Sequence, residues 1–265
     1  MNTNKFLTDL FIQRITFRNE NVTYRASLAV SFFNKTTEFE ALNILREEEK
    51  EQLLAYDYQK RKESYYGGRV SGKIAVSDFT KLKFQEFQID NGVFNQPVIQ
   101  CLTKKNCQVS ISHANHASAS IAFDEKHPLG IDIESVDQKN SITIVEYLTV
   151  GEKAFCVNDN IPLIFWTAKE ALSKVLKTGL TIPLHLLEIK SFRIVDSFYV
   201  ITFVNFAQYK VISFFFQDTI LSIAYPSTSQ LNSSNLIFSD FHQIDLKASV
   251  NHGETLVCVN AENRI

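Results

Sequence analysis

Hydrophobic and polar residues alternate with a period of two in several short segments of the chain. This alternation at residues 11–17, 24–33, 109–113 and 117–123 predicts β-strands. Residues 86–90 and 97–101 predict a hairpin, with Asn91-Gly92 as the turn signal. The chain is dense in Phe, Val and Ile from residue 186 to 224, where we expect three or four further strands.

Helical sequence begins at residues 46–54, which are polar and rich in good helix formers. A second helix is expected over residues 59–76, although Gly67, Gly68 and Gly72 each cost about 1 kcal/mol there relative to alanine. A helix with three glycines indicates the close approach of another backbone or of a ligand.

The clearest helix is predicted at residues 161–178, with Gly179 as its C-cap and Phe165 and Leu172 on its apolar face. Glu170 and Lys174 are i,i+4 neighbours on this helix, an arrangement that is common on exposed helices. Residues 141–157 predict two short helices, and the second opens with a capping box at Thr149 and Glu152.

Residues 129–135 predict a strand with an acidic face. Ile131 and Ile133 alternate with Asp132 and Glu134, so the isoleucines enter a core and the two carboxylates emerge together. Mg²⁺ prefers oxygen ligands and is usually held by one or two carboxylates. The pattern fits a magnesium site, and it equally fits an amphipathic strand with a solvated acidic edge.

Two basic or titratable groups admit similar alternatives. Arg69 and Lys73 share one helix face, which fits either a solvated basic face or an anion-binding surface. His113 ends a predicted strand, where a lone histidine is more often structural than functional.

Composition limits the class of protein. At 265 residues the chain can form one large domain or two smaller ones, and its net charge of −2 argues against general nucleic-acid binding. No uncharged apolar run approaches about 18 residues, so we expect no membrane span. Residues 1–17 have no signal-peptide core, and the four cysteines form no CxxC pair. We therefore expect a cytoplasmic protein with reduced thiols.

Two motifs of the sequence together resemble the signature of the 4′-phosphopantetheinyl transferase superfamily. Residues 130–134 match a G-[IV]-D-[IV]-E strand, and residues 166–174 match an aromatic-x-x-K-E-x-x-x-K helix. Shorter matches are the S-x-S-H strand at residues 110–113, Arg69-x-x-x-Lys73, and the K-x-G-L segment at residues 177–180. The resemblance covers roughly residues 40 to 225, and the length favours the surfactin-synthetase-activating type.

This resemblance implies an α+β fold with two similar α/β halves that form an intramolecular pseudo-dimer, with a C-terminal extension. The halves are expected at residues 1–109 and 110–225, with the metal site in the second half and the active site at their junction. No internal repeat is readable in the sequence. Residues 226–265, rich in Ser and Asn, are expected as a tail with short strands near 236–241 and 255–259. We expect a monomer.

The resemblance also implies the reaction, which is transfer of the phosphopantetheine arm of coenzyme A to a serine of an acyl or peptidyl carrier protein. Adenosine 3′,5′-bisphosphate leaves. Asp132, Glu134 and Glu170 are expected to hold Mg²⁺ against the pyrophosphate, where it withdraws charge from the breaking bond. Glu170 is also the candidate base for the serine proton, and Lys174 is expected to stabilise the pyrophosphate.

Coenzyme A phosphates are expected to bind Ser112 and His113, with Arg61, Lys62 and Arg69 as helpers. The family's Gly-Lys-Pro turn is replaced here by residues 92–97, which contain no lysine. Either Lys104 or Lys105 substitutes for that lysine, or coenzyme A is held more weakly.

Two other functions stay open at this point. One is a non-catalytic relative that binds coenzyme A or a carrier protein. The other is a Mg²⁺-dependent phosphotransferase or hydrolase that acts on another pyrophosphate. No sequence pattern identifies the carrier protein or its pathway.

Overall fold

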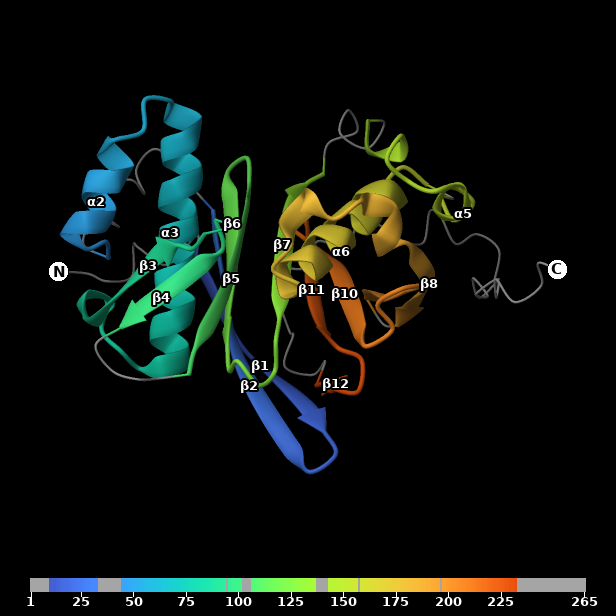
Figure 1. Ribbon diagram of the computed structural model, residues 1–265, viewed down its shortest axis with the longest axis horizontal. Coiled ribbons are helices and arrows are strands. Elements are labelled where there is room, and N and C mark those ends of the chain that lie inside the picture. Colours follow the sequence, from blue (N-terminus) through green and yellow to red (C-terminus); the bar gives the residue numbers. More distant parts are fainter. Residues whose placement is uncertain are drawn as a thin grey trace.

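The computed structural model describes residues 10–32, 44–93, 95–101, 106–136, 143–156, 158–195 and 197–232. Within these ranges the chain contains two five-stranded antiparallel sheets, a two-stranded hairpin and two long helices (Figure 1). The predicted α+β class is confirmed. No helix in the described ranges is long and apolar enough to cross a bilayer.

The first sheet has the strand order β12-β1-β2-β6-β5. Its strands are β1 (Leu10–Asn19), β2 (Val22–Phe32), β5 (Gln108–Ala114), β6 (Ala117–Phe123) and β12 (Gln230–Leu231). The hairpin of β3 (Phe87–Asn91) and β4 (Pro97–Cys101) lies next to β5, after the short 3₁₀ turn Phe84–Glu86. Two helices belong to this part of the fold, α2 (Glu47–Leu54) and α3 (Gln59–Thr80).

The second sheet has the order β7-β11-β10-β9-β8. Its strands are β7 (Gly130–Ser135), β8 (Ile189–Val195), β9 (Phe198–Phe203), β10 (Tyr209–Phe216) and β11 (Thr219–Pro226). Helices α5 (Val150–Lys153) and α6 (Ile161–Val175) precede β8, and the 3₁₀ turns Gly179–Thr181 and Leu184–Leu187 connect α6 to it.

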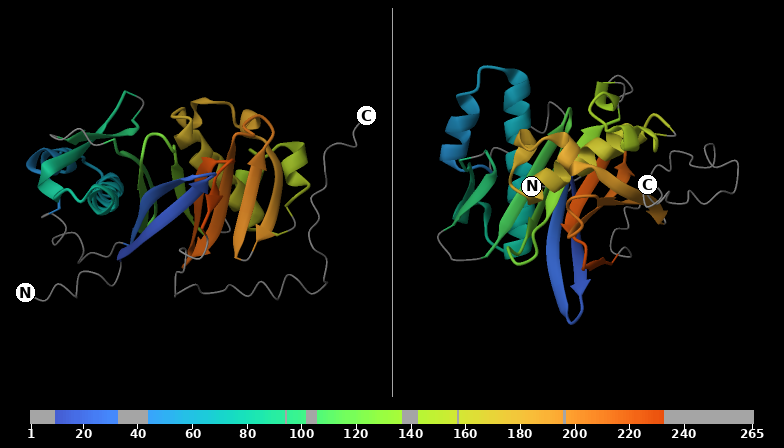
Figure 2. Two further views of the ribbon diagram at one scale, coloured as in Figure 1. Left: turned by 90° about the horizontal axis from the view of Figure 1, so that it is seen from below. Right: turned by 45° about the vertical axis from the view of Figure 1, so that its right-hand side comes forward.

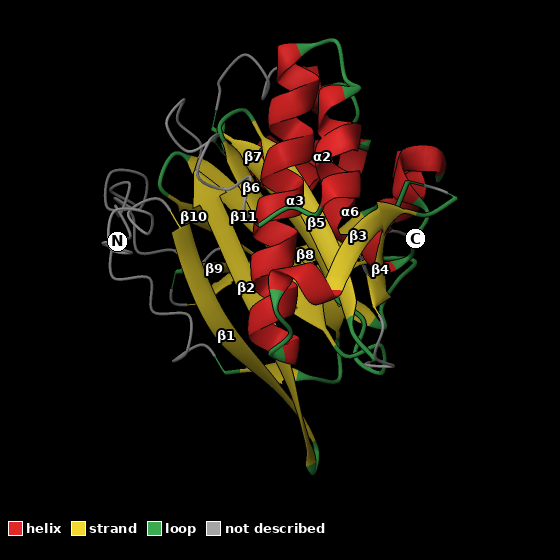
Figure 3. Cartoon of the chain, turned by 90° about the vertical axis from the view of Figure 1, so that its left-hand side faces the viewer, coloured by secondary structure: helices red, strands yellow, loops and turns green. Residues whose placement is uncertain are grey.

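The two sheets face each other, and each carries a long helix on its outer face (Figures 1 and 2). Leu28 and Ile121 of the first sheet and Ile131 and Ile133 of the second lie in one core between the sheets, and all four are buried. Helix α3 covers the far side of the first sheet (Figure 3), and α6 covers the far side of the second. The inward orientation predicted for Ile131 and Ile133 is confirmed.

Several element boundaries differ from the prediction. Helix α6 ends at Val175, and the left-handed residue after it is Lys177, so Gly179 is not its C-cap. The Thr178 amide donates to the Ser173 carbonyl, which closes the helix before Gly179 is reached. The β3–β4 connection runs over residues 92–96, so Asn91-Gly92 is not a two-residue turn. The tail strands expected at 236–241 and 255–259 lie outside the described residues.

The glycines of α3 allow a close approach, as their number indicated. A Cβ atom at Gly72 would lie 2.8 Å from Ile111 Cδ1 of β5 and 2.9 Å from Ile89 Cδ1 of β3. A Cβ atom at Gly68 would lie 3.1 Å from Ile111 Cγ2. The neighbours are therefore side chains of β3 and β5, and α3 packs tightly against β5.

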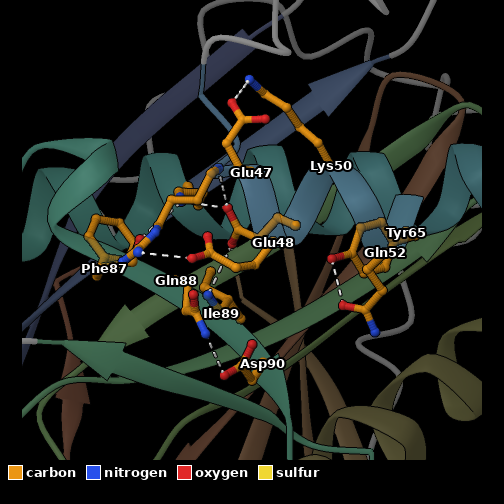
Figure 4. A network of polar contacts seen from close by, with 12 residues as sticks. Glu47, Glu48, Lys50, Gln52, Tyr65, Phe87, Gln88, Ile89 and Asp90 are labelled. Carbon is orange, nitrogen blue, oxygen red and sulfur yellow. Dashed lines mark hydrogen bonds and ion pairs between the residues drawn. The ribbon is translucent and has the colours of Figure 1, made fainter. Parts of the chain in front are cut away.

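A buried ion pair joins the helices of the first half to its hairpin. Lys73 of α3 is fully buried, and its Nζ lies 2.6 Å from Glu49 Oε2 of α2. The other oxygen of Glu49 accepts the amide of Ile89 on β3 at 3.1 Å. Figure 4 shows the surrounding polar contacts, including the Tyr65 hydroxyl that donates to Gln52. Lys73 is therefore neither on a solvated basic face nor available to bind a ligand anion.

The second half contains the same arrangement. Lys169 of α6 is buried, with Nζ 2.8 Å from Glu152 Oε2 of α5, and Glu152 Oε1 accepts the amide of Ile189 on β8 at 2.8 Å. Glu152 also forms the predicted capping box with Thr149. This repeated contact supports two similar halves, although their relation as a pseudo-dimer stays a prediction.

Candidate active site at the junction of the two sheets

The candidate site lies where β5, the edge strand of the first sheet, runs beside β7, the edge strand of the second. Two serine side chains of β5 bridge the gap. Ser110 Oγ accepts the amide of Ile131 at 3.1 Å, and Ser112 Oγ donates to Asp132 Oδ1 at 2.6 Å. The S-x-S spacing puts both hydroxyls on one face of β5, toward β7.

Asp132 is the most constrained acid of the site. Its side chain is only 4% exposed, and Oδ1 accepts from both Ser112 Oγ and Lys174 Nζ, the latter at 2.7 Å. Oδ2 is buried and has no hydrogen-bond partner in the described part of the chain. Because Asp132 is buried, the interpretation of a solvated acidic edge is wrong for this residue. Lys174 pairs with Asp132, so the expected helix-surface pair with Glu170 is not the ion pair that forms.

Gly130 explains how α6 reaches β7. A Cβ atom at this position would lie 2.1 Å from the carbonyl oxygen of Ala171 and 2.8 Å from Val175 Cγ2. No side chain larger than hydrogen fits between the strand and the helix backbone. The absence of a side chain at Gly130 therefore sets the distance at which Glu170 and Lys174 of α6 stand over β7.

The three acids of the site share one electrostatic field. The pKa of Glu134 is raised to about 7, first by burial and then by the negative charges of Asp132 and Glu170, against the opposing charge of Lys174. Burial and the charge of Asp132 likewise raise the pKa of Glu170 to about 7. Glu134 on the strand and Glu170 on the later helix thus both lie close enough to Asp132 for its charge to disfavour their ionisation.

The oxygen atoms of Asp132, Glu134 and Glu170 are suitable ligands for a divalent cation, although the three side chains do not converge on one point. Oxygen donors are what Mg²⁺ prefers, and Asp132 Oδ2 is a buried oxygen that no described donor satisfies. A cation would also reverse the repulsion that raises the pKa of Glu134 and of Glu170. Among the described residues, no three His, Cys, Asp or Glu side chains already form a metal-binding group.

His113 and Arg61 lie at one side of the acids. Desolvation by nearby protein atoms lowers the pKa of His113, although the residue is exposed. The positive charges of Lys174 and Arg61 also lower this pKa, and the negative charge of Asp132 raises it. Arg61 also stacks over Tyr56, with its guanidinium carbon 5.4 Å from the ring centroid. The structure thus groups His113, Arg61, Lys174 and Asp132, four of the predicted site residues.

Arg69 lies apart from this group. It is buried, its Nη2 donates to Asn91 at 2.8 Å, and its guanidinium carbon lies 4.7 Å from the Tyr65 ring centroid. No described contact joins Arg69 or Lys62 to the acids. The contacts of Arg69 connect α3 to the end of β3, so the face of α3 that carries it is buried rather than solvated.

A cavity of about 300 Å³ lies between the two sheets, and Lys174, the partner of Asp132, is part of its lining, whereas Asp132, Glu134 and Glu170 are not. Its walls are mainly apolar and include Pro97, Val109, Ile111 and Leu129. Two lysines also line it, Lys174 of α6 and Lys177 of the segment that follows α6. Lys177 and Ser110 were not among the predicted site residues, although both stand in the short motifs. A third unpredicted residue is Trp166, whose side chain is close enough to Glu134 to lower the pKa of that carboxyl group.

Comparison with known families agrees with the motifs. Residues 128–223 match the model of the 4′-phosphopantetheinyl transferase superfamily, which supports membership of that superfamily and a transferase activity of this general kind. The match contains β7 and α6 and therefore Asp132, Glu134, Glu170 and Lys174. No curated protein matches the chain.

Proposed function

We propose that the chain is a Mg²⁺-dependent 4′-phosphopantetheinyl transferase of the surfactin-synthetase-activating type. It moves the phosphopantetheine arm of coenzyme A to a serine of an acyl or peptidyl carrier protein and releases adenosine 3′,5′-bisphosphate. The observation that carries this proposal is the hydrogen bonding of Asp132: Oδ1 accepts two hydrogen bonds, and the buried Oδ2 accepts none from the residues that the structure describes. The family match over residues 128–223 supports it independently.

Asp132, Glu134 and Glu170 would hold the metal ion, which neutralises charge on the pyrophosphate when bound. Lys174 stands beside Asp132 with a quarter of its side chain exposed, so its ammonium can also reach a ligand phosphate. Lys177 lines the same cavity and adds a second positive charge. Together these lysines favour the transition state, in which negative charge grows on the leaving phosphate.

Glu170 is the proposed general base for the carrier serine. Burial and the charge of Asp132 raise its pKa in the metal-free protein, and a bound cation would lower that pKa again, so that the carboxylate is ionised and can accept a proton near neutral pH. The mixed lining of the junction cavity fits a substrate with an aliphatic arm and phosphates. His113 and Arg61 lie on the proposed side of the nucleotide phosphates, and Ser112, Lys62 and Arg69 stay weaker predictions for the same role.

A non-catalytic relative is the second candidate, because the loop at residues 92–97 contains no lysine to bind a coenzyme A phosphate. Lys104 and Lys105, the suggested substitutes, lie outside the described residues. The complete set of Asp132, Glu134 and Glu170 favours the enzyme.

A transfer assay with fluorescent coenzyme A and a panel of apo carrier proteins tests the proposal. We expect label on a carrier serine, with release of one adenosine 3′,5′-bisphosphate for each label. Asp132→Ala and Glu170→Ala should each lower the rate by at least about 10²-fold, the scale of lost transition-state charge stabilisation. Glu146→Ala, an exposed acid of the same half, is the matched control and should keep full activity.

The other outcomes separate the alternatives. Binding of coenzyme A without any labelled carrier supports the non-catalytic relative, and nucleotide release without a carrier supports a hydrolase. Near-normal transfer by Asp132→Ala or Glu170→Ala contradicts the metal assignment.

A further inference from the structure

We infer that Ser112 is a positioning residue for Asp132, which fixes the aspartate so that Oδ2 stays free for a cation. This inference rests on the proposed function. It differs from the role that the family resemblance assigns to Ser112, which is to bind a phosphate of coenzyme A.

The donor inventory of Ser112 is the first argument. A serine hydroxyl has one hydrogen to donate, and Ser112 donates it to Asp132 Oδ1 at 2.6 Å. Phosphate oxygens at neutral pH are acceptors, so a phosphate would have to compete for this same hydrogen. The side chain is also buried, with only 8% of the residue exposed. The short bond to an ionised partner is of the strong, charge-assisted kind.

The orientation of the carboxylate is the second argument. Without Ser112, Asp132 Oδ1 keeps only Lys174, a long side chain that is one quarter exposed. Rotation of the carboxylate would then bring either oxygen to Lys174. With Ser112 present, Oδ1 accepts hydrogen bonds from Ser112 on β5 and from Lys174 on α6, and Oδ2 is the oxygen that has no partner among the described residues.

The anchoring of Ser112 itself is the third argument. Its backbone carbonyl accepts the Ser118 hydroxyl of β6 at 3.0 Å, and Ser118 lies 2.8 Å from the Ser71 hydroxyl of α3. Ser71 in turn contacts the Gly67 carbonyl at 3.0 Å. A buried series of hydroxyl contacts therefore connects α3 of the first half to Asp132 of the second, and it holds Ser112 in a fixed place.

The metal affinity of variants provides the first test, with no coenzyme A or carrier present. Trp166 is the single tryptophan of the sequence and stands one turn before Glu170 on α6, close to Glu134, so its fluorescence reports on Mn²⁺ at the site. We expect Ser112→Ala to weaken Mn²⁺ binding by roughly 10- to 100-fold, as loss of a residue that orients a metal ligand does. Ser112→Thr, which keeps the hydroxyl, should restore most of the affinity.

Ser27→Ala is the matched control, because Ser27 is also a buried serine whose hydroxyl donates to an aspartate, Asp78 at 2.8 Å, and neither residue belongs to the site. It should lower the melting temperature while its Mn²⁺ affinity stays within about threefold of wild type, since changes at distant sites with no shared partner act independently. If Ser112→Ala leaves Mn²⁺ affinity unchanged and raises only the KM for coenzyme A, Ser112 is a phosphate ligand and the inference is wrong.

A double-mutant cycle separates this inference from the proposed function. Ser112→Ala and Asp132→Asn, alone and together, are compared by urea unfolding in EDTA. We expect a coupling of at least about fivefold in the folding equilibrium constant, as for residues in direct contact. Additive effects would overturn the positioning role even if transfer is observed. A wild-type protein that binds no Mn²⁺ and transfers no label would instead overturn the proposed function, and the cycle alone would then decide the role of Ser112.

Discussion

Glu134 and Glu170 should make the metal-free protein less stable as the pH rises, and Mg²⁺ should remove this loss. Both carboxyl groups have a pKa of about 7 in the folded protein, against 4.5 for an ordinary glutamate. The folded state therefore holds more protons than the unfolded state between these two values. The stability they contribute is fully present below about pH 4.5 and is lost as the pH rises through about 7.

The size of the effect follows from the same pKa values. A difference of 2.5 pH units between 4.5 and about 7 corresponds to about 3 kcal/mol for one isolated group. The two acids share the field of Asp132 and are partly in contact with water, so their contributions do not add in full. We expect a combined loss of about 3 kcal/mol between pH 4.5 and pH 8 in EDTA.

His127 opposes this trend and must be separated from it. It is buried, and burial lowers its pKa to about 4 from an ordinary value of 6.5, so its contribution to stability increases as the pH rises through that range. The assay therefore compares wild type with the double variant Glu134→Gln/Glu170→Gln by urea unfolding at pH 5 and pH 8. His127 contributes equally to both proteins and cancels in the difference.

We expect the double variant to gain about 3 kcal/mol on wild type between pH 5 and pH 8 in EDTA. Millimolar Mg²⁺ at pH 8 should stabilise wild type and leave the double variant unchanged, since a ligand stabilises only the state that binds it. Parallel pH dependences in EDTA would refute the mutual repulsion of the acids. Equal stabilisation of both proteins by Mg²⁺ would refute the metal site.

The remaining predictions concern the two buried ion pairs, the close packing at Gly130 and the role of Lys174. Lys169→Met and Lys73→Met should each lower the free energy of unfolding by about 3–5 kcal/mol in urea unfolding, because each leaves a buried carboxylate unpaired. A loss below about 1 kcal/mol in either variant would contradict the buried ion pairs. Gly130→Ala should lower the free energy of unfolding by about 3 kcal/mol, because the added methyl group clashes with the backbone of α6. Gly68→Ala should cost only about 1 kcal/mol, because its methyl group contacts a methyl group of the Ile111 side chain. Equal melting temperatures for the two variants would refute the close approach of α6. Lys174→Met should lower the rate of transfer in the fluorescent assay by roughly 10²-fold. A rate equal to that of wild type would show that Lys174 does not stabilise the transferred phosphate.

The strand motif predicted that Asp132 and Glu134 share one face of β7, because the period-two alternation fixes the face of each side chain. The pairing of Lys174 could not be predicted in the same way. The i,i+4 spacing indicated Glu170 as the partner of Lys174. The lysine instead pairs with Asp132, which only the tertiary structure brings next to it. Gly130 was part of the motif, but its purpose depends on the backbone of Ala171, a residue of another element.

Buried lysines were the least predictable feature. Lys73 and Lys169 stand in the two helical motifs and resemble ligand-binding residues by type and spacing. Their partners, Glu49 and Glu152, lie on short separate helices, and the sequence carries no signal that connects each lysine to its glutamate. In both places a buried lysine of a long helix pairs with a glutamate of a short helix, and that glutamate accepts the amide of a strand residue; no repeat in the sequence indicates this correspondence.

The central claim is that Asp132 on β7 and Glu170 on α6 hold one divalent cation. The most direct test is an anomalous difference map from crystals of the protein grown with Mn²⁺ and coenzyme A. We expect a peak about 2.1 Å from Asp132 Oδ2 and from an oxygen of Glu170, the distance usual for small divalent cations with oxygen ligands. A peak that contacts neither acid, with coenzyme A bound at the junction, would contradict the account.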